Sequence, residues 1–380
     1  MQATTRRPQN RTSVLDILDI VLDTGEGNLR VGRSLVSQSL PPFPKTCTLN
    51  NTDSLKQSIP MAADQHPDDA FQILSLDGGG IKGVFSAALL AAIEEDLGCT
   101  IIDHFDLIAG TSTGGIIALG LGLGLTPKQI VEFYIKYGRN IFSNKWHHRG
   151  LQHWFYRKYP SKALEEALKA SFGDKLFGDS HKRLVVPSYN LGEDEVYIFR
   201  TPHHQRLKRD FRVPAWKVGM ATSAAPTFFS AFRGVGSVRL VDGGVWANNP
   251  TMVGIVEATS TLDVSLRSIK VLNIGTTDEV SRRSSRLNSG GILTWASEKA
   301  VIDVIMRGQS IAAYNQAIHL LGRDKIIRLS PTVARSEFLL DGHDRTDDLI
   351  GKAAHYSRTF TPQFQQEFGG HKAKPYVSLN

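Results

Sequence analysis

Residues 105–115, FDLIAGTSTGG, decide how this chain folds. The largely apolar residues 105–109 predict a buried strand, and the glycine-rich run after them predicts a sharp turn into a helix at 116–123. The turn has the pattern Gly-x-Ser-x-Gly, with Ser112 flanked by Gly110 and Gly114. Between a strand and a helix, this pattern typically exposes a serine hydroxyl above the sheet edge, because small neighbours relieve crowding in the turn. Ser112 is therefore a candidate nucleophile.

A second glycine turn lies upstream, between an alternating strand at 71–76 and a helix rich in Ala, Leu and Glu at 85–97. It reads Asp-Gly-Gly-Gly-Ile-Lys-Gly over residues 77–83. Glycines let the backbone approach a ligand, and the start of the next helix favours negative charge. Two interpretations stay open. One is a G-x-G-x-x-G dinucleotide site with Asp103 as its acidic partner, and the other is an oxyanion hole for acyl transfer.

A third turn, at residues 241–250, reads VDGGVWANNP. An aspartate at a strand end can project its carboxylate into a cleft, so Asp242 is the candidate general base for Ser112. A free aspartate has a pKa of about 3.9, and burial beside apolar neighbours would raise it. A purely structural Asx-turn before a helix is the alternative.

The rest of the chain predicts an α/β fold. Further strands are expected at 183–188, 195–200, 238–241, 268–275 and 325–329. Strands that alternate with helices imply a mostly parallel sheet covered on both faces. The uncharged run at 107–127 is long enough to cross a membrane. Its glycines and the polar triplet at 111–113 favour a buried strand, turn and helix instead.

Composition sets the outer limits of the protein. The chain has 380 residues, and its two cysteines exclude a disulfide scaffold. Residues 1–69 are polar and predict a disordered or loosely attached extension, with Met61 as an alternative start, whereas 70–380 predict one catalytic domain. The net charge of +7 indicates an anionic partner.

Basic residues gather in two stretches, 139–158 and 200–212. The first also carries tryptophans, tyrosine and phenylalanine and has no acidic residue. This composition suits a lipid interface or a nucleotide pocket equally, and an ordinary surface loop is the third interpretation. Two of the three histidines in the first stretch, His147 and His148, and both in the second, His203 and His204, form adjacent pairs, a spacing that suits a metal site poorly.

The order and spacing of the three turns resemble the patatin-like phospholipases. That family combines a D-G-G-G-x-[KR]-G loop, a G-x-S-x-G turn and a D-G-[GA] turn, and Lys82 matches the basic position of the first. Residues 221–229 and 248–250 also resemble family signatures. The resemblance covers residues 71–275 and excludes 1–69. It implies a three-layer α/β/α sandwich with a mostly parallel central sheet, related to the α/β-hydrolase and cytosolic phospholipase type.

The resemblance also implies roles for individual residues. Ser112 would be the nucleophile and Asp242 the base of a Ser–Asp dyad, with no metal and no resident cofactor. Backbone N–H groups of Gly78, Gly79 and Gly80 would form the oxyanion hole. The residues expected to support these motifs are Asp77, Lys82, Gly83, Gly110, Gly114, Gly243 and Gly244.

The implied activity is hydrolysis of the fatty-acyl esters of membrane phospholipids. The amino-acid sequence of residues 105–125 and 199–229 is most similar to that of bacterial antiphage-defence phospholipases that a cyclic dinucleotide activates. The resemblance therefore implies a phospholipid surface and a cyclic dinucleotide as partners, rather than nucleic acid. It also implies assembly into an oligomer on activation, and action in the cytoplasm at the inner face of the cell membrane.

Other functions remain open at this point. A constitutive patatin-like esterase is one. A Ser-His-Asp esterase would need a histidine such as His319, His343 or His355. A dinucleotide-binding module and a catalytically silent, ligand-gated scaffold belong to different classes.

Overall fold

The computed structural model describes residues 70–142, 159–280, 284–289, 291, 294–295, 300–334 and 337–379. The side chains of 279–280 and 300–303 lie outside this description. So do residues 1–69 and most of the basic stretch 139–158, and what the sequence predicts for them stays a prediction.

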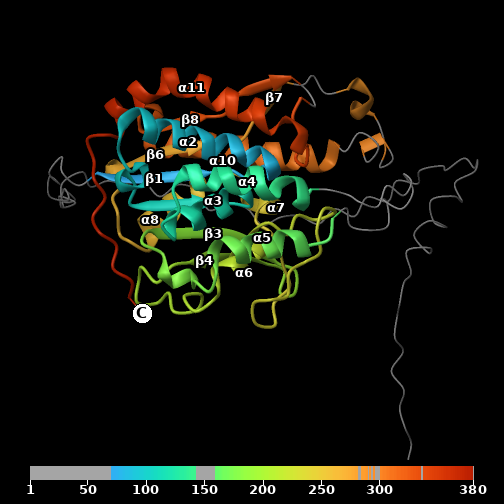
Figure 1. Ribbon diagram of the computed structural model, residues 1–380, viewed down its shortest axis with the longest axis horizontal. Coiled ribbons are helices and arrows are strands. Elements are labelled where there is room, and N and C mark those ends of the chain that lie inside the picture. Colours follow the sequence, from blue (N-terminus) through green and yellow to red (C-terminus); the bar gives the residue numbers. More distant parts are fainter. Residues whose placement is uncertain are drawn as a thin grey trace, which may run out of the picture. The chain divides into compact units, whose positions relative to one another are not determined.

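A seven-stranded sheet forms the centre of the described part, in the order β4-β3-β2-β1-β6-β8, with β5 also paired to β3 (Figure 1). Its strands are β1 (Phe71–Leu76), β2 (Leu107–Gly110), β3 (Arg183–Asn190), β4 (Glu195–Arg200), β5 (Leu240–Asp242), β6 (Ile269–Ile274) and β8 (Ile326–Leu329). The pairs β1–β2, β1–β6, β2–β3 and β6–β8 are parallel, whereas β4 and β5 run antiparallel to β3. The prediction of a mostly parallel sheet is therefore confirmed. A small parallel pair, β7 (Asp278–Val280) and β9 (Thr332–Ala334), was not expected from the sequence.

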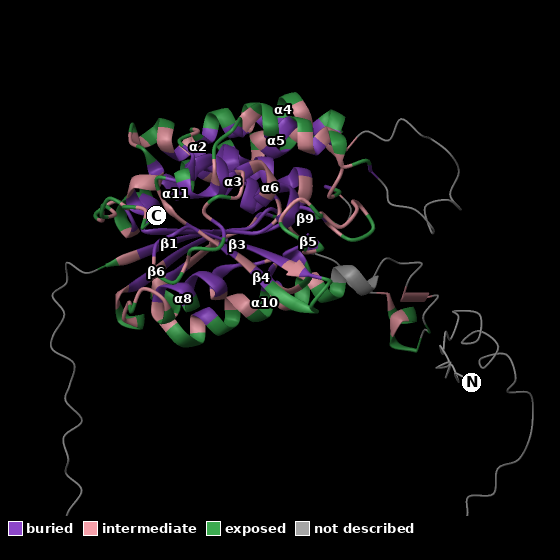
Figure 2. Cartoon of the chain, turned by 90° about the horizontal axis from the view of Figure 1, so that it is seen from below, coloured by how far each residue is buried: buried purple, intermediate pink, exposed green. Residues whose placement is uncertain are grey.

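Helices cover both faces of this sheet. Figure 2 shows α2, α3, α4, α5, α6 and α11 on one face and α8 and α10 on the other. Their bounds are α2 (Gly83–Leu97), α3 (Thr113–Gly122), α4 (Pro127–Ile141), α5 (Lys162–Phe172), α6 (Ala215–Thr222), α7 (Gly244–Ala247), α8 (Thr251–Ser260), α10 (Ala300–Leu321) and α11 (Thr346–Glu367). The expected three-layer α/β/α sandwich is confirmed.

The alternation of side chains along the strands explains the two cores. Leu74 and Ile108 point to one face, where they join the apolar cluster of α2, α3 and α11. Ile73 and Leu107 point to the other, where they pack with apolar residues of α8 and α10. Because both faces are buried, these strands read as continuous apolar runs.

The uncharged run at 107–127 is not a membrane span. It forms β2, a tight turn and the fully buried helix α3. Among the residues that the structure describes, no helix is both long and apolar enough to cross a bilayer.

Candidate active site

Ser112 lies at the junction between β2 and α3, with φ 55° and ψ −121°. A side chain rarely adopts this left-handed φ, and such strain typically costs about 1–3 kcal/mol. Neighbouring contacts hold the turn in place. The Ser112 N–H donates to Thr222 Oγ1 at 3.0 Å, and a Cβ on Gly114 would lie 2.2 Å from the Leu76 carbonyl oxygen. The predicted strand-turn-helix is present, and Ser112 is the strained residue in it.

The carboxylate of Asp242, at the end of β5, lies directly against this serine. Ser112 Oγ donates to Asp242 Oδ2 at 2.7 Å, and the Gly244 N–H donates to Oδ1 at 2.6 Å. The second bond is the Asx-turn that was the structural alternative, so the turn and the contact with serine coexist. Burial raises the pKa of Asp242 from 3.8 to about 6, although both hydrogen bonds oppose the rise. The carboxylate is therefore ionised near neutral pH, yet basic enough to take a proton from serine.

The glycine loop after β1 packs against the same serine. A Cβ on Gly78 would lie 3.3 Å from Ser112 Cβ and 2.4 Å from Asn248 Oδ1. The Gly78 N–H donates to the Asn248 carbonyl at 2.9 Å, and this bond removes Gly78 from the predicted oxyanion hole. Among the described residues, the N–H groups of Gly79 and Gly80 have no protein acceptor. These two amides are therefore available to an oxyanion.

Close packing also explains the glycines at 79 and 80. A Cβ on Gly79 would lie 2.2 Å from Thr276 Oγ1. Gly80 has a left-handed φ of 60°, and its Cβ would lie 2.2 Å from the Leu340 carbonyl oxygen. Neither position has room for a side chain, and the backbone itself forms the surface of the loop.

A buried ion pair anchors the start of this loop. Asp77 Oδ2 lies 2.7 Å from Arg328 Nη1 on β8, and Asn273 Nδ2 of β6 donates to Asp77 Oδ1 at 2.7 Å. Burial raises the pKa of Asp77, while Arg328 and Asn273 oppose that rise. The sequence motif identified Asp77, but no local signal identified Arg328 or Asn273 as its partners.

The remaining motif residues serve packing. A Cβ on Gly83 would lie 2.1 Å from Thr113 Oγ1, one on Gly110 would lie 2.3 Å from the Gly114 carbonyl oxygen, and one on Gly243 would lie 2.3 Å from the Pro187 carbonyl oxygen. Lys82 is buried in the short turn after the glycines. These contacts pack the three turns closely against their surroundings.

No histidine of the described chain completes a triad. His319 is exposed on α10, His343 pairs with Asp344 at 2.7 Å, and the His355 ring packs edge-on against Tyr356. None of them contacts Ser112 or Asp242 among the described residues. The Ser-His-Asp alternative is therefore disfavoured.

The dinucleotide alternative fails on topology. Gly78 follows β1, whereas Asp103 lies in a short helical turn (Ile101–His104) that precedes β2. Because β1 and β2 are parallel, these residues lie at opposite edges of the sheet. Asp103 is therefore unable to contact a ribose bound at the glycine loop.

The basic stretch at 200–212 is partly internal. Arg200 pairs with the buried Glu257 at 2.7 Å, and Arg209 pairs with the buried Asp210 at 2.8 Å. His203 also contacts Glu257, at 3.0 Å. Arg200 and Arg209 therefore neutralise acidic groups of the fold rather than facing a ligand. Among the described residues, no cluster of His, Cys, Asp or Glu is arranged to hold a metal ion.

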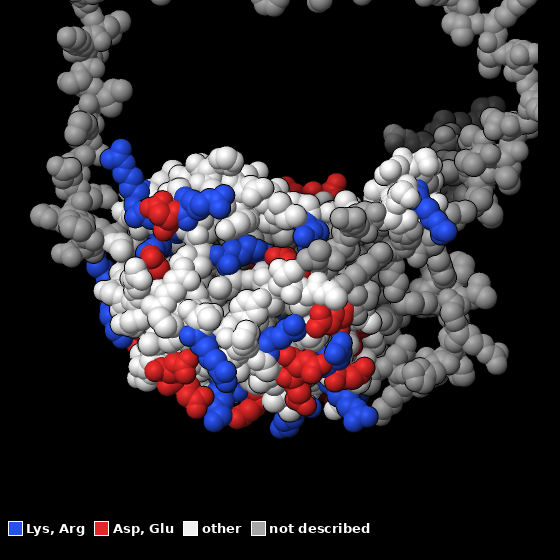
Figure 3. All heavy atoms as spheres, turned by 90° about the horizontal axis from the view of Figure 1, so that it is seen from above, with Lys and Arg blue, Asp and Glu red and all other residues white. Residues whose placement is uncertain are grey.

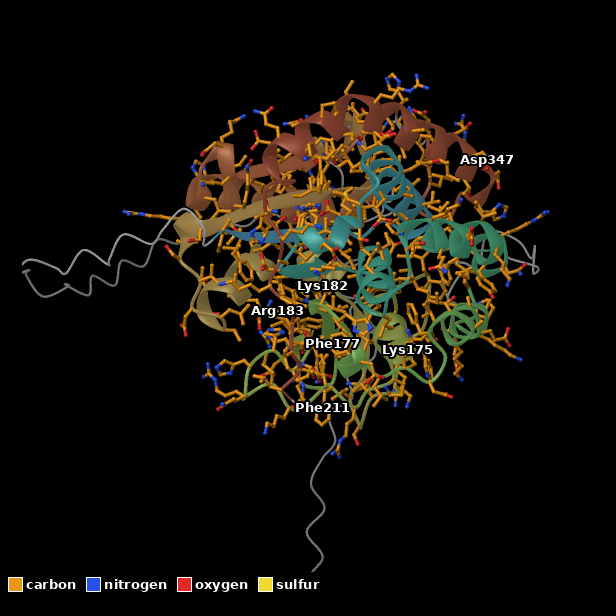
Figure 4. All side chains as sticks on the ribbon, turned by 60° about the vertical axis from the view of Figure 1, so that its left-hand side comes forward. Lys175, Phe177, Lys182, Arg183, Phe211 and Asp347 are labelled. Atoms are coloured by element: carbon orange, nitrogen blue, oxygen red, sulfur yellow. The ribbon has the colours of Figure 1, made fainter. Side chains whose placement is uncertain are left out.

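Other basic side chains nearby are also used within the fold. In Figure 4, Lys182 and Arg183 lie side by side at the start of β3, above Phe177. Lys182 Nζ and Arg183 Nη1 donate to the carbonyls of Phe105 and Asp106, each at 3.3 Å. On the face drawn in Figure 3, Lys and Arg are interspersed with Asp and Glu. The described residues of that face therefore form no continuous basic patch.

In this α/β/α sandwich a buried carboxylate contacts the hydroxyl group of a strained serine directly. The sequence matches the model of the patatin-like phospholipase family over residues 74–255. The chain belongs to this family of carboxylic ester hydrolases.

Three relatives illustrate the relationship. The chain is 33% identical over 273 residues to the "cGAMP-activated phospholipase" of Vibrio cholerae, which aligns 65% of this chain with 77% of that protein. It is 32% identical over 300 residues to an Escherichia coli protein of the same name, with 71% and 83% covered. An Escherichia coli "cUMP-AMP-activated phospholipase" is 31% identical over 218 residues, with 55% and 65% covered.

Proposed function

We propose that Ser112 and Asp242 form the catalytic dyad of a phospholipase that cleaves the fatty-acyl esters of membrane phospholipids. The observation that carries the proposal is the 2.7 Å hydrogen bond from Ser112 Oγ to Asp242 Oδ2. A serine is a weak nucleophile unless an adjacent base takes its proton, and this carboxylate is positioned to do so.

The proposed reaction has two halves. In the first, Asp242 accepts the proton of Ser112 while the serine oxygen attacks the ester carbonyl carbon. The resulting oxyanion accepts hydrogen bonds from the Gly79 and Gly80 amides. The ester C–O bond then breaks, and the leaving lysophospholipid oxygen takes the proton from Asp242.

The second half releases the fatty acid. Water gives a proton to Asp242 and attacks the acyl-serine carbonyl, which forms a second oxyanion at the same amides. The bond between Ser112 and the acyl group breaks, Ser112 recovers its proton from Asp242, and the free fatty acid leaves. The reaction needs no group besides substrate and water.

The proposal includes regulation. A cyclic dinucleotide activates the enzyme, which then degrades phospholipid at the inner face of the cell membrane in antiphage defence, with assembly into an oligomer on activation. The names of the relatives from Vibrio cholerae and Escherichia coli support activation by a cyclic dinucleotide, and they differ in which dinucleotide it is.

Release of fatty acid from phospholipid vesicles tests both parts. Wild type, Ser112→Ala and Asp242→Asn are each assayed with cGAMP, with cUMP-AMP and without nucleotide, and the exposed Ser260→Ala serves as the matched serine control. We expect release by wild type and the control only with a nucleotide, and none above background by the dyad variants. Equal release by Ser112→Ala would overturn the dyad. Full release without nucleotide would overturn the regulation and favour a constitutive esterase.

A further inference from the structure

Helix α10 supports the Asp242 turn from outside the part of the chain that matches the family model. It packs against α7 and α8, on the face of the sheet opposite α3 (Figures 1 and 2). The family match ends at residue 255, whereas α10 begins at Ala300. Two consecutive polar side chains of this helix, Gln309 and Ser310, contact the turn that carries Asp242.

Gln309 bridges the two ends of α7. Its Nε2 donates to the Gly244 carbonyl at 2.6 Å, and its Oε1 accepts from the Asn248 N–H at 3.0 Å. Helix α7 has four residues, which is too short for a helix to be stable by itself. A side chain that bonds both of its ends therefore fixes its position. Gly244, the first residue of α7, donates its own N–H to Asp242 Oδ1.

The same contacts reach the glycine loop. The Asn248 N–H donates to Gln309 Oε1, and the Asn248 side-chain Nδ2 donates to Ser310 Oγ at 3.2 Å. The Asn248 carbonyl accepts the Gly78 N–H. One helix therefore holds the carboxylate through Gly244 and the glycine loop through Asn248. These two parts must keep a fixed spacing around Ser112 for proton transfer and oxyanion binding to occur together.

We propose that Gln309 is a positioning residue of the dyad, which holds the Gly244 N–H on Asp242 Oδ1 and sets the spacing between Asp242 and the glycine loop. The proposal rests on the proposed function. Gln309 acts through Gly244 and Asn248, and does not contact Ser112 or Asp242 itself.

The pH dependence of activity should report a change at Gln309, because the pKa of Asp242 depends on its hydrogen bond from Gly244. Burial and the bonds from Gly244 and Ser112 account for the raised pKa of Asp242. Charged groups on elements packed around it, such as Arg183 of β3, Lys217 of α6 and Arg307 of α10, are not among its causes. Loosening the Gly244 bond removes an influence that lowers the pKa of Asp242, so that pKa must rise.

The test compares Gln309→Met with Gln316→Met. The first keeps the length of the side chain and removes both hydrogen bonds, and the second makes the same change at an exposed position of the same helix. Two readouts are measured against pH. They are kcat/KM on phosphatidylglycerol–phosphatidylethanolamine vesicles with the nucleotide that activates wild type, and the rate at which a fluorophosphonate labels Ser112.

For Gln309→Met we expect kcat to fall about tenfold or more with KM unchanged, since a small misplacement of reacting groups costs up to ~10²-fold. The acid limb of both pH profiles moves to higher pH. Gln316→Met behaves as wild type. Gln309→Ala removes the same two hydrogen bonds with a smaller side chain, is expected to show the same changes, and carries the test if Gln309→Met does not fold.

The outcomes separate the two proposals. If Ser112→Ala is labelled or hydrolyses vesicles like wild type, the proposed function fails. If Ser112→Ala is inert but the Gln309 variants keep the wild-type kcat and acid limb, the dyad stands and the positioning role is overturned. A rise in KM alone, with kcat and the acid limb unchanged, also overturns the positioning role.

Discussion

Replacing Asp242 by asparagine should abolish catalysis and stabilise the fold. Asparagine has nearly the same shape, its Oδ1 is able to accept the Gly244 N–H, and its Nδ2 is able to donate to Ser112 Oγ. Both hydrogen bonds of the buried carboxylate therefore keep a partner. What disappears is the charge, which burial penalises and which raises the pKa of Asp242 to about 6.

The sign and size of the effect follow from linkage. The folded chain binds a proton at Asp242 more tightly than the unfolded chain, so wild-type stability falls as pH rises from 3.8 through about 6. Over that range the loss amounts to about 3 kcal/mol. Asparagine does not titrate and avoids this loss. The variant should exceed wild type by about 1.5 kcal/mol near pH 5 and by about 3 kcal/mol near pH 8.

Urea unfolding followed by circular dichroism, at several pH values between about 5 and 8, measures this difference. Glu166→Gln removes an exposed carboxylate on α5 and is the matched control, for which we expect no comparable gain. An Asp242→Asn protein that is no more stable than wild type near pH 8 would refute the reasoning. It would mean that Asp242 is not desolvated as its burial implies.

Three further predictions concern the same site. The acid limb of the wild-type kcat/KM profile should fall at about pH 6, where Asp242 takes up its proton; a limb near pH 4 would contradict a buried base. Gly79→Ala should lower kcat by about 10²–10³-fold, as loss of an oxyanion donor does in other hydrolases, because the added methyl group would clash with Thr276 Oγ1. Vesicle assays measure the loss, on protein whose thermal stability is unchanged. Full activity would exclude the Gly79 amide as an oxyanion donor. Arg328→Met leaves Asp77 buried without its cation, so urea unfolding should show that the free energy of unfolding falls by about 3–5 kcal/mol. A fall of less than about 1 kcal/mol, which is typical of an exposed ion pair, would show that the pair does not anchor the loop.

The sequence predicted the elements of this protein well where the signals are local. The strand at 71–76 and that at 195–200 have the expected bounds. The start of α4 is set by signals of the same local kind, since Thr126 and Gln129 form a capping box with Pro127 at the first position. Each of these depends on residues a few positions apart, which interact in the same way in any fold.

Predictions that depended on distant partners were less complete. Gly78 looked equivalent to its two neighbours in the sequence, but only its N–H reaches the Asn248 carbonyl. All five cations at 200–212 looked available to a ligand in the sequence, whereas two of them, Arg200 and Arg209, pair with buried acids. Nothing in a local pattern shows whether a polar group already has a partner.

The sequence alone determined the strained serine turn, the aspartate at a strand end and the alternation of strands with helices, because these follow from the sizes and periodicities of neighbouring residues. Only the tertiary structure decided that Ser112 Oγ meets Asp242, 130 positions away, and that burial makes that carboxylate a stronger base. It alone brought Arg328 to Asp77 and Gln309 to the Asp242 turn. Hydrogen bonds and desolvation act over a few ångströms in space, and the packing of the sheet and α10 sets those distances.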